Sequence, residues 1–157
     1  MNTFMLVEAG VALNPEWGIG LMFGQMYDGV GWYVKGRSNW NIPKKDQYGG
    51  KLFNTTKETT SLEWLVDAGM VIDFLMKKEK KDKDNFLGLY VGAGYGSRER
   101  FWLNKFKYGV IYPANSYKGV SANIGMIGSW HGMTFMAGVN TLAFKYMEVE
   151  IGLGYTF

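Results

Sequence analysis

Apolar and polar side chains alternate at every second position over much of this chain. In residues 62–74, LEWLVDAGMVIDF, Trp64 and Val66 share one row with other apolar residues, while Glu63 and Asp67 lie in the opposite row. A strand sends successive side chains to opposite faces of a sheet, whereas a helix would scatter these carboxylates around its surface. The pattern therefore predicts a strand with one apolar face and one acidic face.

The same period recurs along the chain and predicts eight strands, most of about ten residues. The other seven segments are residues 5–13, 17–23, 32–40, 87–95, 120–130, 133–140 and 148–157. Turn residues such as Asp28-Gly29 and His131-Gly132 separate some of them, and the connections 42–61 and 102–118 are long. We expect a single all-β domain that covers residues 1–157, built from antiparallel strands.

Composition agrees with a sheet and excludes several function classes. The 157 residues include 22 glycines, 17% are aromatic and none is cysteine. Disulfide scaffolds, thiolate metal sites and cysteine nucleophiles are therefore excluded. The net charge of +3 is too small to indicate nucleic-acid binding, and much of the positive charge lies in residues 77–84, KKEKKDKD, which read as a solvated turn.

The two faces of the sheet differ in volume, which decides the face that lies inside a closed barrel. Eight strands enclose a space just wide enough for side chains, yet the apolar row holds tryptophan and tyrosine while the other row is rich in glycine. The bulky row must point outward, where only lipid would tolerate it. We expect an up-and-down transmembrane β-barrel with a polar lumen and a lipid-facing apolar exterior. A soluble lipocalin-like lipid-binding barrel, with the faces reversed, is an alternative.

The N-terminus shows no secretory signal, because Glu8 and Asn14 interrupt its apolar stretch and no basic segment precedes it. We expect an exported form of the chain to correspond to a mature protein.

The last eight residues, EIGLGYTF, alternate up to the terminal carboxylate. Glu150, Gly152, Tyr155 and Phe157 provide a polar residue, a glycine, an aromatic residue and a terminal aromatic residue at the spacing of a known motif. The segment resembles the C-terminal assembly signal of bacterial outer-membrane β-barrel proteins.

Over nearly its whole length the chain resembles the small eight-stranded barrels of the OmpX, OmpA and OmpW type. The resemblance implies a porin-like protein in the outer membrane of a Gram-negative bacterium, with both termini periplasmic. Asp28-Gly29, residues 77–84 and His131-Gly132 would then be periplasmic turns, and residues 14–16, 42–61, 102–118 and a turn near Lys145 would face outward. The implied partners are outer-membrane lipid and lipopolysaccharide, the barrel assembly machinery, and another outer-membrane protein.

Ten charged residues have the parity of the lumen or its mouths, and buried charges must be paired. They are Glu8, Lys35, Arg37, Glu63, Asp67, Asp73, Arg98, Arg100, Glu148 and Glu150. One interpretation is a network that fills and locks a barrel without a pore. The other is a small channel that would favour cations, because acidic residues outnumber basic residues in the predicted lumen.

No catalytic residue, cofactor or metal site is expected. His131 is the single histidine, and it is predicted to lie in a periplasmic turn. A catalytic base that acts near the outer leaflet would have to lie on the other side of the membrane. The long loops instead combine lysines with aromatic residues, which can contact lipopolysaccharide, glycans or a protein. The aromatic residues chosen are Trp40, Tyr48, Trp102, Tyr108 and Tyr112. We expect a structural, adhesive or partner-binding role through these outer loops.

Overall fold

The computed structural model describes residues 1–12, 17–39, 44–45, 55–74, 85–104, 108–111 and 116–157. The strands are β1 (Asn2–Ala12), β2 (Trp17–Tyr27), β3 (Val30–Ser38), β4 (Lys44–Lys45), β5 (Thr55–Asp73), β6 (Phe86–Asn104), β7 (Tyr108–Ile111), β8 (Tyr117–Trp130), β9 (Met133–Leu142) and β10 (Tyr146–Thr156). No helix in this part of the chain is long and apolar enough to cross a membrane.

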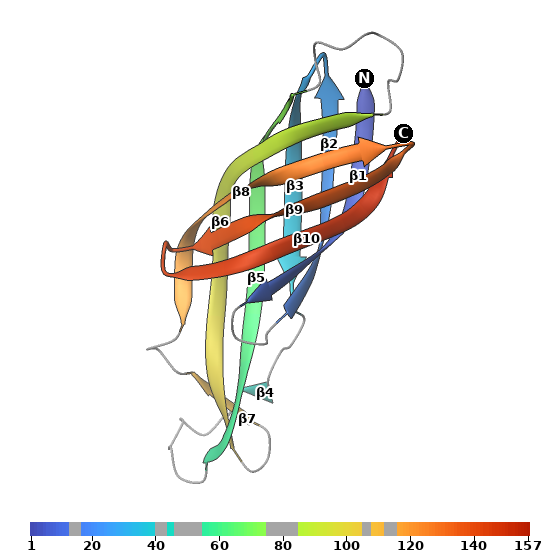
Figure 1. The fold of residues 1–157 in the computed structure, drawn as a ribbon. Coiled ribbons are helices and arrows are strands. Elements are labelled where there is room, and N and C mark those ends of the chain that lie inside the picture. The colour runs from blue at the N-terminus through green and yellow to red at the C-terminus, as the bar shows by residue number, and fades with distance from the viewer. Residues whose placement is uncertain (13–16, 40–43, 46–54, 75–84, 105–107, 112–115) are drawn as a thin grey trace.

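Eight long strands form one closed antiparallel sheet, which confirms the predicted fold class. The order is β6-β5-β3-β2-β1-β10-β9-β8, and pairing of β6 with β8 closes the barrel (Figure 1). The first and last strands are neighbours, since β1 pairs with β10 from Phe4 opposite Thr156 to Ala12 opposite Glu148. Closure leaves these strands without a free edge along the barrel wall.

Both chain termini lie at the same end of the barrel, here called the terminal end (Figure 1). The turns Asp28-Gly29 and His131-Gly132 lie there too, because Asp73 N donates to Gly29 O and Thr156 N donates to Gly132 O. All four turn residues have positive φ, as tight hairpin turns require. The opposite end, called the loop end, receives the β9–β10 turn; residues 77–84 lie outside the described residues.

Large apolar side chains cover the outside of the barrel wall. Leu21, Val66, Ile124 and Ile151 are each about half exposed although they lie in mid-strand. Exposed and buried residues alternate along these strands, for example over most of the length of β3. The soluble lipocalin-like alternative requires the bulky apolar face inside, so this arrangement contradicts it.

The interior has two parts. Most of the buried charged side chains lie toward the loop end, whereas an apolar cluster is buried nearer the terminal end. That cluster consists of Phe4, Leu6, Met22, Met26, Tyr33, Val71, Phe86, Tyr90, Ile127 and Met136. The predicted polar lumen therefore describes only part of the interior.

Glycine makes room for these inward aromatic rings. A β-carbon at Gly69 would lie 2.6 Å from Tyr33 Oη, and one at Gly125 would lie 2.6 Å from Tyr90 Cε1. The Tyr90 hydroxyl also lies directly against the backbone of Gly138. The glycine-rich row identified in the sequence is thus the surface on which buried tyrosines pack.

Strands β5 and β6 are longer than predicted, at 19 residues each, and extend beyond their neighbours at the loop end (Figure 1). Their pairing runs on to Thr55 opposite Asn104, while β3 pairs with β5 only as far as Trp64. Strand β7 adds to β6, and β4 adds to β7 in parallel. The alternation of apolar and polar residues that marks the other wall strands is absent from residues 55–61 of this extension.

Candidate functional site

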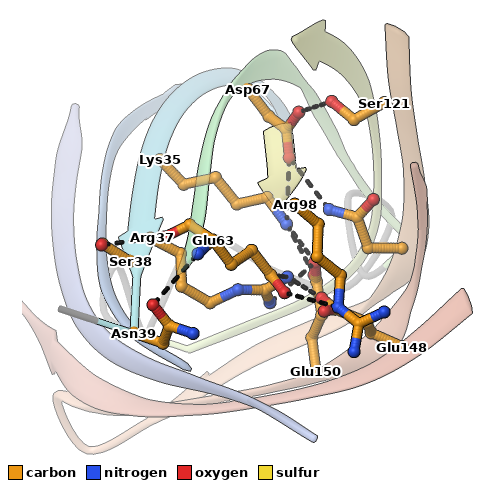
Figure 2. Close-up of polar contacts among 11 residues, drawn as sticks. Lys35, Arg37, Ser38, Asn39, Glu63, Asp67, Arg98, Ser121, Glu148 and Glu150 are labelled. Carbon is orange, nitrogen blue, oxygen red and sulfur yellow. Dashed lines mark hydrogen bonds and ion pairs between the residues drawn. The ribbon is translucent and has the colours of Figure 1, made fainter. Parts of the chain in front are cut away.

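The charged cluster in the barrel interior is the candidate site. It begins with Lys35 and Arg37, which lie two residues apart on β3 and therefore point to the same face. Both are almost completely buried. Figure 2 shows them reaching across the interior from β3 toward carboxylates on β10.

Lys35 connects two carboxylates on different strands. Its ammonium nitrogen lies 2.6 Å from both carboxylate oxygens of Glu150 and 3.5 Å from Asp67 Oδ2. All three side chains are completely buried. Such pairs hold only when the geometry compensates the cost of removing each charge from water.

Arg37 makes the largest set of ion pairs. It donates to Glu148, and its terminal nitrogens lie 3.5 Å from Glu63 Oε1 and 3.5 Å from Glu150 Oε1. Its side chain lies over the backbone of Gly10, where a β-carbon would collide with the guanidinium group, and of Gly18, where a β-carbon would lie 3.2 Å from Arg37 Cγ and Cδ. These glycines allow Arg37 to cross β2 and β1 on its way to β10.

Polar neutral residues complete the cluster on the opposite side of the barrel. Asp67 accepts hydrogen bonds from the Ser121 hydroxyl and, at 3.1 Å, from Asn140 Nδ2 (Figure 2). Tyr33 donates to Asn123 Oδ1, and Tyr90 donates to Glu150 Oε2 at 3.2 Å. Together with the ion pairs of Lys35, these hydrogen bonds connect six strands: β3, β5, β6, β8, β9 and β10.

Arg98 lies at the loop-end edge of the cluster. Its guanidinium carbon is 4.1 Å from the centre of the Tyr146 ring, and its Nε is 3.8 Å from Glu63 Oε2. Tyr146 in turn stacks on Tyr117. Arg98 therefore combines a cation–π contact with an ion pair at the mouth of the barrel.

The structure brings together most of the charged residues chosen from the sequence. Seven of them share the contacts above: Lys35, Arg37, Glu63, Asp67, Arg98, Glu148 and Glu150. Glu8 is buried beside them and accepts no hydrogen bond from the described residues. Asp73 instead lies at the terminal end, where it accepts a hydrogen bond from Leu87 N. Arg100 is half-buried at the loop end and its amide bonds Ser116.

Several polar residues of the cluster were absent from the predicted charge network. Tyr33, Tyr90, Ser121, Asn123 and Asn140 are neutral, so a search for charge overlooked them. Each shares the inward parity of a charged or glycine residue on its own strand, which is the signal that identifies them.

The other predicted residues are placed as follows. Glu150 and Gly152 face inward on β10, while Tyr155 and Phe157 are exposed and their rings stack 6.5 Å apart. Trp40, Tyr48 and Tyr112 lie outside the described residues; Trp102 belongs to β6 and Tyr108 to β7, both at the loop end. His131 lies in the β8–β9 turn, against the ring of Trp130.

No protein-family model and no curated protein matches the chain. The N-terminal β-barrel domain of Pseudomonas aeruginosa OprF superimposes with a TM-score of 0.60 at 11% identity, over 99% of this chain and 97% of that one. Ail, the attachment invasion locus protein of Yersinia pestis, matches in its complex with sucrose octasulfate with a TM-score of 0.58 at 13% identity, over 99% and 95%. The chain has the fold of the small outer-membrane β-barrels.

This barrel fold explains why the cluster forms where it does. Eight strands leave little interior volume, so side chains from strands far apart in sequence meet at the centre. Because these identities are so low, the likeness concerns the fold and not the charged residues. Within the described residues, no group of three histidine, cysteine, aspartate or glutamate side chains is arranged to hold a metal ion.

Proposed function

We propose that this chain is an integral protein of a Gram-negative outer membrane that acts through its loop end. Both termini would be periplasmic and the loop end would face outward. The exposed apolar wall supports a location in lipid, since a surface of this kind aggregates in water. The C-terminal motif supports insertion by the barrel assembly machinery, with Phe157 as part of the signal.

The observation that carries the proposal is the number of side chains buried inside the barrel. The charged cluster and the apolar cluster together occupy the barrel with side chains from all eight wall strands. An interior of this kind supports a structural core in place of a transport path. The function then falls to the surface that the barrel presents.

The loop end offers a surface suited to binding. Strands β5 and β6 carry β7 and β4 beyond the barrel wall, which gives a small sheet that stands clear of the membrane-facing wall. Among the described strands, none pairs with the outer edge of β4. Exposed strand edges bind extended segments of other chains through main-chain hydrogen bonds.

We favour an adhesive role toward polyanionic surface components. The long loops are rich in lysine, including Lys44 and Lys45 on β4. Ail, which shares the fold, was solved with a sulfated heparin analogue. Clustered lysines bind phosphate and sulfate groups by charge attraction that salt weakens.

A binding assay tests this role with a control pair of lysines from the sequence between β5 and β6. Purified protein in detergent is passed over immobilised heparin and over lipopolysaccharide at several salt concentrations. The double variant Lys44→Gln/Lys45→Gln should elute at lower salt than the original protein, whereas Lys77→Gln/Lys78→Gln should elute at the same salt. Equal loss in both variants would mean that net charge alone explains binding and would contradict a loop-end site.

The channel alternative is favoured by one observation, the acidic excess among the buried side chains. Planar-bilayer recordings separate the two functions. The filled interior leads us to expect no steady conductance from the original protein. Steady cation-selective currents that change with Glu63→Gln would favour the channel and overturn the proposed role of the interior.

A further inference from the structure

The buried charges of the barrel interior do not balance. Among the described residues, five buried side chains are carboxylic acids and three are cationic. The acids are Glu8, Glu63, Asp67, Glu148 and Glu150, and the cations are Lys35, Arg37 and Arg98. Two carboxylates are therefore in excess, and an uncompensated charge in such a place is strongly unfavourable.

The three cations are already engaged by other carboxylates. Lys35 is held by Glu150 and Asp67, and Arg37 is held by Glu148, Glu150 and Glu63. Arg98 lies next to Glu63 and the Tyr146 ring. None of these pairs includes Glu8.

Glu8 is completely buried, yet neither of its carboxylate oxygens has a hydrogen-bond partner among the described residues. Its flanking positions on the neighbouring strands are Gly20 on β2 and Gly152 on β10. A β-carbon at Gly20 would lie 2.8 Å from Glu8 Oε1, so the carboxylate lies over that glycine inside the barrel. With glycine opposite it on both neighbouring strands, Glu8 has no side-chain donor at either paired position.

We propose that Glu8 is the binding site of an exchangeable cation at the centre of the barrel. The cation is a proton or a hydrated alkali-metal ion, and both supply the same chemistry, one positive charge on an otherwise unpaired carboxylate. The charged and titratable groups that face this site are Tyr33, Lys35 and Arg37 on β3, Asp67 on β5, Tyr90 on β6 and Glu150 on β10. Glu63, Arg98 and Glu148 are buried in the same charged cluster. The inference rests on the barrel interior and is independent of the binding role proposed for the loop end.

The test compares the original protein with Glu8→Gln, and uses Glu148→Gln as a control that removes a paired carboxylate. Thermal unfolding of the folded protein in detergent is measured at constant ionic strength in sodium, potassium or N-methylglucamine chloride. Infrared difference spectra of the original protein minus Glu8→Gln report the carbonyl band of a protonated carboxyl group.

If the cation is an alkali-metal ion, the original protein should melt higher in sodium or potassium than in N-methylglucamine, and Glu8→Gln should lose this difference. If it is a proton, the carbonyl band should appear in the difference spectrum and the melting temperature should not depend on the salt. In both cases Glu8→Gln should fold, because glutamine resembles the neutralised acid, while Glu148→Gln should melt lower.

An ionised, salt-insensitive Glu8 would overturn the proposal. So would a folded Glu8→Gln variant that melts as low as Glu148→Gln, since that outcome would mean that Glu8 is paired to Lys35 or Arg37. The infrared spectrum of the original protein in the three salts decides the case even where the variant cannot be purified.

Discussion

At the scale of single residues, Lys35 and Arg37 hold the two sides of the barrel together. Both lie on β3, and both reach carboxylates of β10, which is three strands away in the sheet. A buried pair adds little net stability compared with apolar packing, but breaking one side of it leaves the partner charge unpaired. Arg37 has three such partners and is therefore the most sensitive position.

Arg37→Met should lower the free energy of unfolding by about 3–5 kcal/mol, because Glu63, Glu148 and Glu150 would lose their shared cation. Urea unfolding in detergent or lipid vesicles measures this loss. Val66→Ala, on the exposed side of β5, serves as the control and should cost less than about 1 kcal/mol. Similar losses in the two variants would contradict the role of the ion pairs.

Gly138→Ala should destabilise the barrel by about 1–3 kcal/mol, since the new methyl group would collide with the Tyr90 hydroxyl. Gly36→Ala is the matched control, because its β-carbon would meet nothing closer than Leu65 O at 3.9 Å. Tyr90→Phe removes the colliding oxygen and should rescue part of the loss in the double variant. Equal unfolding midpoints for the two alanine variants would contradict the packing of tyrosine on glycine.

Parity alone selected the ten charged residues, and it did not predict which of them pair. Lys35 and Glu150 are 115 residues apart in the chain, so their contact depends on closure and register, which a local pattern does not contain. The difference in volume placed the glycine-rich row inside and the bulky apolar row outside. Tyr33 and Tyr90 fit inside because glycines on facing strands remove the competing volume.

At the scale of the strands, the closing pair β1 and β10 determines whether the sheet becomes a barrel. Its hydrogen bonds continue to the last residue, since Thr3 N donates to Phe157 O and Phe157 N donates to Thr3 O, both at 2.9 Å. The Phe157 ring is exposed on the outer face, next to Tyr155. The terminal residue thus contributes a backbone pair and an accessible ring.

Phe157→Ala should reduce the amount of folded protein in the outer membrane while leaving the backbone pair with Thr3 in place. Phe157→Tyr keeps an aromatic ring and should assemble normally. Heat-modifiable mobility on gels distinguishes folded from unfolded barrel in membrane fractions, and refolding in detergent reports stability separately. Normal insertion of Phe157→Ala would contradict the assembly-signal hypothesis.

The presence of the wall strands was predictable, because each strand has one apolar and one polar face. The length of the strands was not predictable. Residues 55–61, TTKETTS, lack alternation, yet they continue β5. They are held by pairing with β6, a long-range effect that leaves no period in the sequence. The tight turns at Asp28-Gly29 and His131-Gly132, by contrast, follow from residues that tolerate positive φ.

At the scale of the whole molecule, the apolar face of the closed sheet points outward and the polar face points into the barrel. Apolar side chains on all wall strands point outward, and a charged cluster and an apolar cluster are buried inside the barrel. Lipid outside and side chains inside account for both observations. The central claim is therefore that the outward rows lie in a bilayer.

Site-directed spin labelling tests this claim most directly, since the chain has no cysteine of its own. Single labels at Val66, Ile124 and Ile151 lie on three different strands and leave the interior untouched, while a label at the exposed Lys145 of the β9–β10 turn is the control. In lipid vesicles, the three wall labels should be relaxed by oxygen and shielded from a water-soluble nickel complex, and the turn label should show the reverse. Wall labels that respond to the nickel complex as strongly as the label at Lys145 would contradict a transmembrane barrel.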